Sequence, residues 1–347
     1  MARLRARLPL LVGKEHKRQR STVNKALYAL EHSDAFLAAS AFQTRQRRQT
    51  AADAIAHDAG TKSHDEDDKA TSAPSARAVE VARLHFRSVV TSCYDDFAPH
   101  YEATLRRLGY GTPGKMVAAL LAAVVSDTQQ EGTKASDDPP VVLSSRLAMD
   151  VGCGTGLSGA AVCRHCRGRL VGCDLSTRML GVAATKRREA ACGDDKGGLL
   201  YDALDCCDAA AFLLRAAASS ADLIMACEVL CYCHELDGLF AAVRRCLAPR
   251  GLFAFSVELA TAGEVECPPQ GPGWIERPSE RMAHSEAYVR QLIAGGRSPE
   301  AADAAPAGDA DDAVEGGGLE LLSIAEETLR TDEGAPIRGL IVVVRKR

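Results

Sequence analysis

Residues 147–159 read Leu-Ala-Met-Asp-Val-Gly-Cys-Gly-Thr-Gly-Leu-Ser-Gly, and this stretch decides the fold. An apolar run ends in Asp150, and the glycines that follow include Gly152, Gly154 and Gly156. Because glycine lacks a Cβ atom, such a turn can adopt unusual dihedral angles and let a ligand approach the backbone closely. Residues 169–174, Arg-Leu-Val-Gly-Cys-Asp, form a second apolar run that closes on a carboxylate. The sequence therefore predicts strand, glycine loop, helix and strand, the βαβ unit of nucleotide-type pockets.

Two kinds of cofactor suit this pocket, and the glycine pattern alone fits both. Gly154, Gly156 and Gly159 spell the G-x-G-x-x-G of dinucleotide-binding proteins, with Asp174 near the ~20-residue spacing of a ribose contact. S-adenosylmethionine (SAM) has one ribose and no phosphate. A carboxylate at Asp150 would repel a pyrophosphate, but it would attract the ammonium and sulfonium groups of SAM. The charge argument favours SAM over a dinucleotide, and over a glycine-rich turn that binds nothing.

The composition places most of the charge asymmetry at the start of the chain. The 347 residues are 46% hydrophobic and 25% charged, which is ample for one sizeable domain with extensions. Residues 1–50 carry a net charge of +8, so that the overall charge of −4 leaves −12 for the remainder. Phosphate binding rests on Lys and Arg, so we expect no nucleic-acid partner. The longest apolar run, residues 116–125, is shorter than the ~20 residues that span a bilayer, so we expect no membrane partner and a soluble protein.

Thirteen cysteines raise the questions of disulfides and metals. The chain is long and has no apolar signal-peptide core, so we expect reduced thiols in a reducing, intracellular compartment, either cytoplasmic or organellar. Cys163-Arg-His-Cys166 and Cys231-Tyr-Cys-His234 resemble zinc ligands, but neither has a partner pair at zinc-finger spacing. We therefore expect no metal site.

The predicted organisation is an N-terminal extension, residues 1–75, followed by one domain, residues 76–347. The extension is basic and interleaved with leucine at its start, which fits either an organelle-targeting segment, such as a mitochondrial one, or a disordered tail. The Ala-, Asp- and Gly-rich residues near 296–318 predict a disordered insertion in the domain.

Seven strand-like runs alternate with helical stretches in residues 76–347. Alternation of this kind predicts an α/β fold in which a mostly parallel sheet has helices on both faces. The last two runs are separated only by a short turn, which can join antiparallel strands alone. Residues 126–140 are polar and predict a loop. The predicted strands are 147–151, 170–173, 201–207, 223–227, 252–257, 319–329 and 337–345, and the predicted helices include 79–108, 176–191 and 236–247.

These residues resemble the class I SAM-dependent methyltransferases, whose Rossmann-like sheet has seven strands and an antiparallel C-terminal hairpin. The chain is most similar to predicted methyltransferases that often follow tetratricopeptide repeats, although residues 1–75 show no such repeat. The resemblance covers roughly residues 85–347. It is carried by residues 94–105 (Tyr-Asp-Asp-Phe-Ala-Pro-His-Tyr-Glu-Ala-Thr-Leu), 222–232 (Asp-Leu-Ile-Met-Ala-Cys-Glu-Val-Leu-Cys-Tyr), 252–258, 281–285 and 334–339.

The resemblance implies SAM as the cofactor and assigns its contacts. Asp174, with Leu175 beside it, would accept hydrogen bonds from both ribose hydroxyls. Asp208 would read the adenine amino group, with Asp205 as the fallback. The residues implied to border the methionine part or the transferred methyl group are Asp150, Gly152, Cys153, Gly154, Gly156, Ala226 and Cys227, and Tyr94 and Tyr101 would cover the cofactor as an aromatic lid. Helix packing explains the spacing of those tyrosines equally well.

The methyl acceptor is the open question. Enzymes of this fold that modify bases or glutamine carry Asn/Asp-Pro-Pro-Tyr/Phe after the fourth strand, where this chain has Ala-Cys-Glu-Val. We therefore expect a small-molecule or protein acceptor. His284 is the leading candidate for a general base, because histidine titrates near neutrality, and a structural histidine is the alternative. Glu228 and His234 are further candidates, and Trp274 is a candidate substrate contact.

Two other functions remain open at this point. A non-catalytic assembly or interaction protein could use the same fold, with the basic N-terminus as a docking arm. An NAD(P)-dependent oxidoreductase fits the glycine pattern, but the chain lacks a second catalytic domain downstream. Our prediction is a SAM-dependent methyltransferase.

Overall fold

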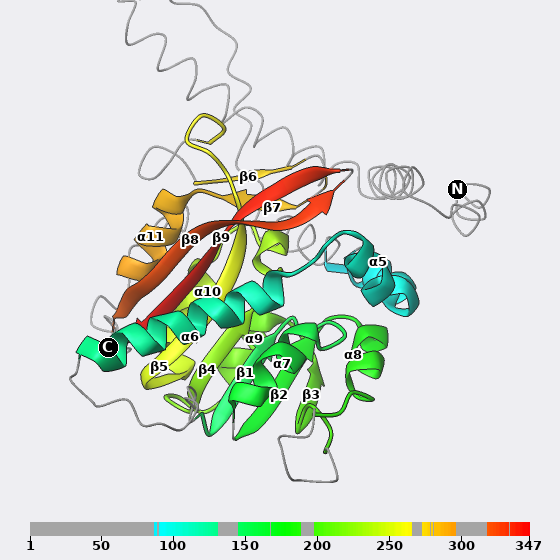
Figure 1. Cartoon of the computed structure of the whole chain (residues 1–347), viewed down its shortest axis with the longest axis horizontal. Helices are drawn as coiled ribbons and strands as arrows, with labels where there is room; N and C mark the ends of the chain where they lie inside the picture. Colours follow the sequence, from blue (N-terminus) through cyan, green and yellow to red (C-terminus); the bar gives the residue numbers. More distant parts are fainter. Residues whose placement is uncertain are drawn as a thin grey trace, which may run out of the picture. The chain divides into compact units, whose positions relative to one another are not determined.

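The computed structural model describes residues 87–88, 90–130, 145–166, 168–188, 198–265, 273–277, 279, 281–295, 318–332 and 334–347 (Figure 1). The chain divides into two compact units, Met1–Cys93 and Tyr94–Arg347. The predicted extension, residues 1–75, and almost all of the predicted insertion near 296–318 lie outside the described residues.

The second unit alternates strands and helices. Its strands are β1 (Leu147–Val151), β2 (Arg169–Asp174), β3 (Ala203–Cys206), β4 (Ala221–Ala226), β5 (Leu247–Leu259), β6 (Trp274–Glu276), β7 (Met282–His284), β8 (Leu319–Asp332) and β9 (Ala335–Lys346). Its α-helices are α5 (Tyr101–Arg107), α6 (Thr112–Gln130), α7 (Leu157–Val162), α8 (Thr177–Ala183), α9 (Ala209–Arg215), α10 (Asp237–Cys246) and α11 (Glu286–Ala294), and its short 3-10 turns are η2 (Ala98–His100), η3 (Cys163–His165) and η4 (Leu230–Tyr232).

One sheet holds all of these strands. Strands β3, β2, β1, β4 and β5 are neighbours in that order and run parallel, and β9 continues the sheet antiparallel to β5 and pairs in turn with β8. This confirms the predicted fold class, a mostly parallel sheet that ends in an antiparallel hairpin. Two short strands were not predicted: β7 pairs with the end of β5, and β6 pairs with β7.

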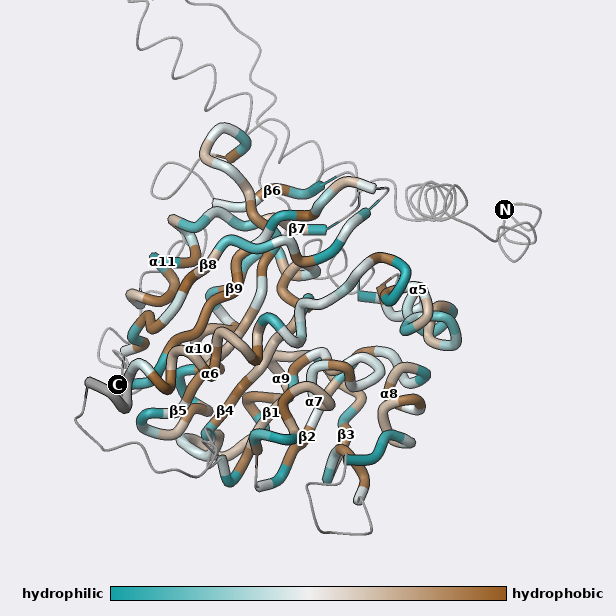
Figure 2. Tube along the Cα trace, viewed as in Figure 1, coloured by the Kyte–Doolittle hydropathy of each residue, from teal (hydrophilic) through white to brown (hydrophobic). Residues whose placement is uncertain are grey.

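Helices cover both faces of the sheet (Figure 1), and the trace of its central strands is mostly hydrophobic (Figure 2). In β5, Phe253, Phe255 and Val257 join a core cluster with residues of α9, α10 and α11. Leu252 and Ala254 face the other way, into a cluster with residues of α6, α7 and α8. A strand buried on both faces reads as a continuous hydrophobic run, which explains why β1, β4 and β5 were predictable.

Helix α6 differs from its prediction. The segment 126–140 was predicted as a loop, but α6 continues to Gln130. The helix contacts β5, β8 and β9 through an apolar stripe that includes Met116 and Leu120 (Figure 1). Among the described residues no single helix is long and apolar enough to cross a membrane, and one bent pair, Val90–Arg107 with Thr112–Ser126, meets that test by length and composition only.

Two further predictions need correction at helix ends. The helix predicted over residues 176–191 stops at Ala183, and the chain then turns into an isolated antiparallel bridge between Arg187 and Leu199. The second correction concerns Cys163 and Cys166, which we expected to lie in the helix that follows the glycine loop. That helix ends at Val162, Cys163 begins a 3-10 turn, and Cys166 follows the turn in extended backbone.

Candidate active site

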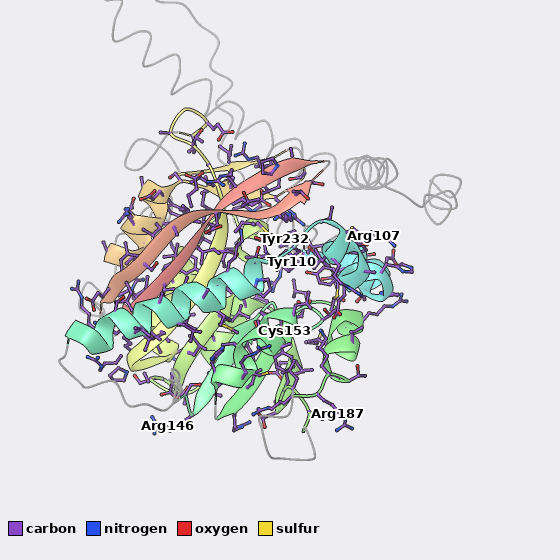
Figure 3. The ribbon with its side chains drawn as sticks, viewed as in Figure 1. Arg107, Tyr110, Arg146, Cys153, Arg187 and Tyr232 are labelled. Atoms are coloured by element: carbon purple, nitrogen blue, oxygen red, sulfur yellow. The ribbon has the colours of Figure 1, made fainter. Side chains whose placement is uncertain are left out.

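The predicted site residues gather where the parallel strands end. Tyr110 and Tyr232 lie at the end of the sheet near α5. Arg146, just before β1, and Arg187 lie at the opposite end (Figure 3). In open α/β sheets, ligands bind outside the carboxyl ends of the strands, at the point where the strand order reverses. Here that point is the carboxyl end of β1 and β4.

The glycine loop after β1 combines left-handed backbone with tight packing. Gly152, Gly154 and Gly156 have φ angles of 64°, 54° and 88°, which L side chains adopt only at a cost. A Cβ atom on Gly152 would lie 1.8 Å from Val229 Cγ2, and one on Gly156 would lie 2.9 Å from Tyr201 Cε2. At Gly154 the nearest atom would be a ring carbon of Tyr101, at 3.9 Å. The outer glycines therefore pack against the protein, and Gly154 has the open surface.

Asp150 lies beneath the loop instead of beside a ligand. Its side chain is fully buried, and it accepts hydrogen bonds from Ser158 Oγ (2.7 Å) and the hydroxyl of Tyr201 (2.6 Å). Burial raises its pKa to about 6, although these hydrogen bonds and one from the Gly159 amide oppose the shift. The carboxylate thus joins strand, loop and helix α7. Its predicted contact with the methionine part of SAM stays a prediction.

Asp174, at the end of β2, is fixed by two backbone amides. Its Oδ2 accepts from the Gly154 N–H and its Oδ1 accepts from the Ser176 N–H, both at 2.9 Å. Burial raises its pKa, and the amide hydrogen bonds oppose this. The Leu175 amide contributes a further backbone hydrogen bond to the same carboxylate. Asp174 is therefore fixed at the end of β2, beside Gly154 of the glycine loop.

The remaining predicted cofactor residues occupy neighbouring strand ends. Asp208 caps α9, where its side chain accepts from the Ala211 N–H at 2.8 Å. Asp205, the fallback, is exposed and pairs with Arg215. Among the other predicted contacts, Leu175 follows β2 and is half-buried, and Cys153, Ala226 and Cys227 are buried. Their predicted contacts are not tested by the geometry.

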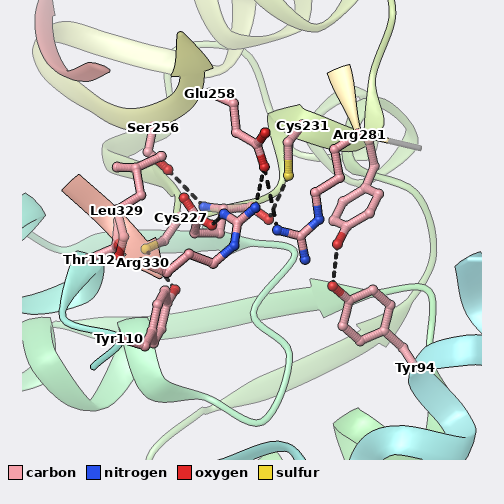
Figure 4. A network of polar contacts seen from close by, with 12 residues as sticks. Tyr94, Tyr110, Thr112, Cys227, Cys231, Ser256, Glu258, Arg281, Leu329 and Arg330 are labelled. Atoms are coloured by element: carbon pink, nitrogen blue, oxygen red, sulfur yellow. Dashed lines mark hydrogen bonds and ion pairs between the residues drawn. The ribbon is translucent and has the colours of Figure 1, made fainter. Parts of the chain in front are cut away.

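The two tyrosines of the predicted lid belong to an aromatic group. Tyr101 packs edge-on against Phe97 and Tyr94, with ring centroids 5.6 and 6.0 Å apart. Tyr94 packs in the same way against Tyr232, at 5.7 Å, and the two hydroxyls share a hydrogen bond (Figure 4). Asp95 anchors this segment to the start of α8, because its Oδ1 accepts from Ser176 Oγ (2.6 Å).

A buried ion-pair network lies beyond these rings (Figure 4). The guanidinium of Arg330, in β8, pairs with Glu228 after β4 and with Glu258 in β5. Arg281 lies 3.4 Å from the same Glu258 oxygen, and its guanidinium carbon is 5.4 Å from the centre of the Tyr232 ring. Charges taken out of water in this way are stable only when they are paired.

The three predicted bases, Glu228, His284 and His234, are engaged in contacts with other residues, and His234 packs edge-on against Trp274 with ring centroids 5.1 Å apart. Glu228 has a left-handed backbone (φ 59°), and its carboxylate pairs with Arg330. His284, in β7, is fully buried, and its Nε2 lies 3.1 Å from the carbonyl oxygen of His234, which makes Nε2 the protonated nitrogen. Burial lowers the pKa of His284 to about 4, so its Nδ1 is a weak base. Trp274, predicted as a substrate contact, is buried.

The comparisons with known proteins agree with this arrangement of loop and acid. A family model described as "Methyltransferase domain" matches residues 149–255, from β1 into β5. A malonyl-[acyl-carrier protein] O-methyltransferase of Methylovorus sp. (strain MP688) is 31% identical over 119 residues, which is 33% of this chain and 38% of that protein. The chain thus spans well under half the length of this relative.

Solved methyltransferases also align with the chain. A SAM-dependent methyltransferase from Methanosarcina mazei has 16% identity and a TM-score of 0.40, and covers 61% of this chain and 99% of its own. The N-methyltransferase NodS from Bradyrhizobium japonicum WM9, in complex with S-adenosyl-L-homocysteine, has 18% identity and a TM-score of 0.37. The alignment covers 65% of this chain and 98% of NodS. These scores are too low to support an argument about substrate.

Several functional candidates in and around the methyltransferase domain were not singled out in the sequence. Arg330 and Glu258 lie inside strands, where a charged residue carries no motif, and they become notable only because β5 and β8 bring them together. Arg281 lies in the quoted segment 281–285, next to His284, and that proximity was the available signal. Within the described residues, no group of three or more His, Cys, Asp or Glu side chains is placed to hold a metal ion.

Proposed function

We propose that the chain is a SAM-dependent methyltransferase. The observation that carries the proposal is Asp174, whose carboxylate is fixed at the end of β2 by the Gly154 and Ser176 amides, beside the glycine loop. Ribose presents two adjacent hydroxyl donors, and a fixed carboxylate matches both. The methyltransferase-domain match over residues 149–255 supports the same reading.

The residues present fit this cofactor. Gly154 offers open surface beside Asp174, and the Tyr101 ring lies over it. The charge argument from Asp150 is weaker than the sequence suggested, because that carboxylate is buried and hydrogen-bonded. When bound, SAM supplies an activated methyl group on a sulfonium. The chain then has to hold donor and acceptor in line and exclude water, which can contribute most of the acceleration.

The acceptor that we propose is a small molecule or a group carried on a protein. The Methylovorus relative is named for a malonyl group on an acyl-carrier protein, which supports an acceptor of this kind. A kinship with methyltransferases that follow tetratricopeptide repeats is proposed on the sequence motifs alone. A reducing, intracellular compartment is proposed on the cysteine content, and the eleven cysteines in the described part are free thiols.

Calorimetric titration with S-adenosylhomocysteine, SAM and NADH in parallel tests the proposal. We expect saturable binding of the first two and none of NADH. Binding of NADH alone would replace the proposal with an oxidoreductase, and binding of none of the three would favour a non-catalytic interaction protein.

A further inference from the structure

We propose that the methyl acceptor carries a carboxylate, that Arg281 binds it, and that a carboxylate oxygen receives the methyl group. This inference rests on the proposed function and narrows it to one class of acceptor and one bond, an ester. It is carried by the ion-pair contacts of Arg281, by the position of Arg281, and by the contacts that engage Glu228 and His284.

Arg281 and Arg330 are neighbours in one network but differ in their pairing. Arg330 is 6% exposed, and its two terminal nitrogens are bonded to two different glutamates, Glu228 and Glu258. Arg281 is 19% exposed, and its ion-pair contact with a described residue is the 3.4 Å approach to the Glu258 oxygen that Arg330 already holds. The remaining N–H groups of Arg281 have no acceptor among the described residues. A planar guanidinium fork with free donors matches a carboxylate in bidentate geometry.

The position of Arg281 connects it to the proposed cofactor site. The Tyr101 ring lies over Gly154, and edge-to-face contacts lead from Tyr101 to Tyr94 and from Tyr94 to Tyr232. The Arg281 guanidinium lies against the Tyr232 ring. A small acceptor held by Arg281 would therefore lie across a single group of aromatic rings from the glycine loop.

The protonation requirements of the site select the same acceptor. A hydroxyl or ammonium acceptor has to lose a proton before or during transfer. Glu228 pairs with Arg330, and the His284 imidazole is buried with its pKa lowered to about 4. Neither Glu228 nor His284 is suited to take that proton. A carboxylic acid has an ordinary pKa near 4, so it arrives at neutral pH already ionised and needs no base.

The transfer balances without a further reactant. A lone pair of the carboxylate oxygen forms the new O–CH3 bond while the S–CH3 bond of SAM breaks, and the electron pair of that bond stays on sulfur. The products are a methyl ester and S-adenosylhomocysteine, and no proton is gained or lost. Arg281 holds the second carboxylate oxygen and orients the first toward the methyl group.

A transfer assay with the full chain tests the inference. SAM labelled with tritium in its methyl group is offered with a panel of carboxylates, and each carboxylate is matched by its primary amide. The panel holds acetate, benzoate, malonate, succinate, glutarate and the N-acetylcysteamine thioesters of malonate and succinate. We expect label on at least one carboxylate, none on its amide, and release of that label as volatile methanol in mild alkali, as a methyl ester requires.

Three variants separate acceptor binding from folding. Arg281→Gln is expected to raise KM for the labelled carboxylate by at least ~10-fold, equal to ~1.4 kcal/mol, with kcat reduced less and affinity for S-adenosylhomocysteine unchanged. Arg281→Lys, which keeps the charge, should recover part of the loss. Arg290→Gln, which removes an exposed pair with Glu286 on α11, is the matched control and should match the wild type.

The outcomes distinguish this inference from the proposed function. Alkali-stable label, equal transfer to amides, an unchanged KM in Arg281→Gln, or no transfer to any carboxylate by a chain that binds S-adenosylhomocysteine would each overturn the inference and leave the cofactor assignment standing. Failure of the wild type to bind S-adenosylhomocysteine would remove the proposed function itself.

Discussion

At the scale of single residues, two aspartates from adjacent strands have opposite environments. Asp150 is enclosed by the side chains of Ser158 and Tyr201, whereas Asp174 is held by backbone amides. Both end an apolar run in the sequence, so their residue types could be predicted as important together. Their different surroundings could not be predicted, because Tyr201, whose hydroxyl donates a hydrogen bond to Asp150, lies 51 positions away in the sequence.

Replacement of Asp174 by asparagine should weaken cofactor binding. The side-chain NH2 group of the asparagine is a donor, and it would face a backbone N–H or a ribose hydroxyl that needs an acceptor. We expect this mismatch to cost about 1–3 kcal/mol of binding free energy. Calorimetry with S-adenosylhomocysteine measures the change. Asp205→Asn, at the exposed fallback position, is the control and should bind S-adenosylhomocysteine as tightly as the wild type does. An equal loss of affinity in both variants would contradict the assignment of the cofactor contact to Asp174 alone.

Asp150 should make the stability of the domain depend on pH. Its folded-state pKa of about 6 lies above the usual value of 3.8, so the folded state binds the proton more tightly than the unfolded state does. The contribution of Asp150 is therefore most favourable below pH ~4 and is lost as the pH rises to ~6, by roughly 3 kcal/mol at most. Asp150→Asn cannot ionise. Relative to the wild type, its unfolding free energy should rise across this window in urea titrations, and a constant difference from pH 4 to 7 would contradict the assignment.

At the scale of elements, the loop between β1 and α7 divides its glycines between packing and access. Gly152 meets Val229, whereas Gly154 has open surface, although both have left-handed backbone. The sequence predicted the loop but gave both glycines the same role. The distinction depends on Val229, which reaches the loop from beyond β4.

Alanine at the two positions should separate stability from binding. Gly152→Ala combines backbone strain with a clash and should lower the unfolding free energy by about 2–5 kcal/mol. Gly154→Ala adds only the backbone strain, about 1–2 kcal/mol, but should weaken S-adenosylhomocysteine more than Gly152→Ala does in the folded fraction. Denaturant titration and calorimetry on both proteins check the two effects, and similar stability losses would argue against the packing role of Gly152.

The ion-pair network joins β8 to β5 and to the residue Glu228 after β4. It also explains why the sequence predicted the end of β8 at the wrong residue. The sequence predicts that the strand stops at Leu329, because Arg330 follows, but β8 continues to Asp332 with Arg330 buried. A charge can lie inside a strand only when its partners arrive from elsewhere, and Glu228 and Glu258 are far away in the chain. Likewise β6 and β7 are three-residue strands without a pattern long enough to predict.

Removal of Arg330 should be costly. Arg330→Met leaves two buried carboxylates without their main partner and should destabilise the fold by about 3–5 kcal/mol, measured by urea unfolding. The triple variant Arg330→Met, Glu228→Gln, Glu258→Gln should regain part of that loss. Arg338→Met, at a half-exposed pair with Glu326, should cost at most ~1 kcal/mol. If the stability loss of the triple variant equals the sum of the losses of the three single variants, the three residues act independently.

At the scale of the whole molecule, the described part of residues 94–347 accounts for the sheet, its two apolar clusters and every described contact in the candidate site. We predict that deletion of residues 1–75 leaves the affinity for S-adenosylhomocysteine within ~2-fold of that of the full chain, because the described contacts of the site come from later residues. Calorimetry on both proteins checks this. A large loss would assign the extension to the fold.

The order of the strands in space has a consequence for how the protein is made. β9 lies between β5 and β8, yet it is translated after both. Until β9 emerges from the ribosome, β5 presents one edge of unpaired N–H and C=O groups, and β8 has no partner in the sheet. Open edges of this kind are templates for wrong pairing with other chains. The nascent protein therefore passes through a stage at which these strand edges are exposed to pairing with other chains.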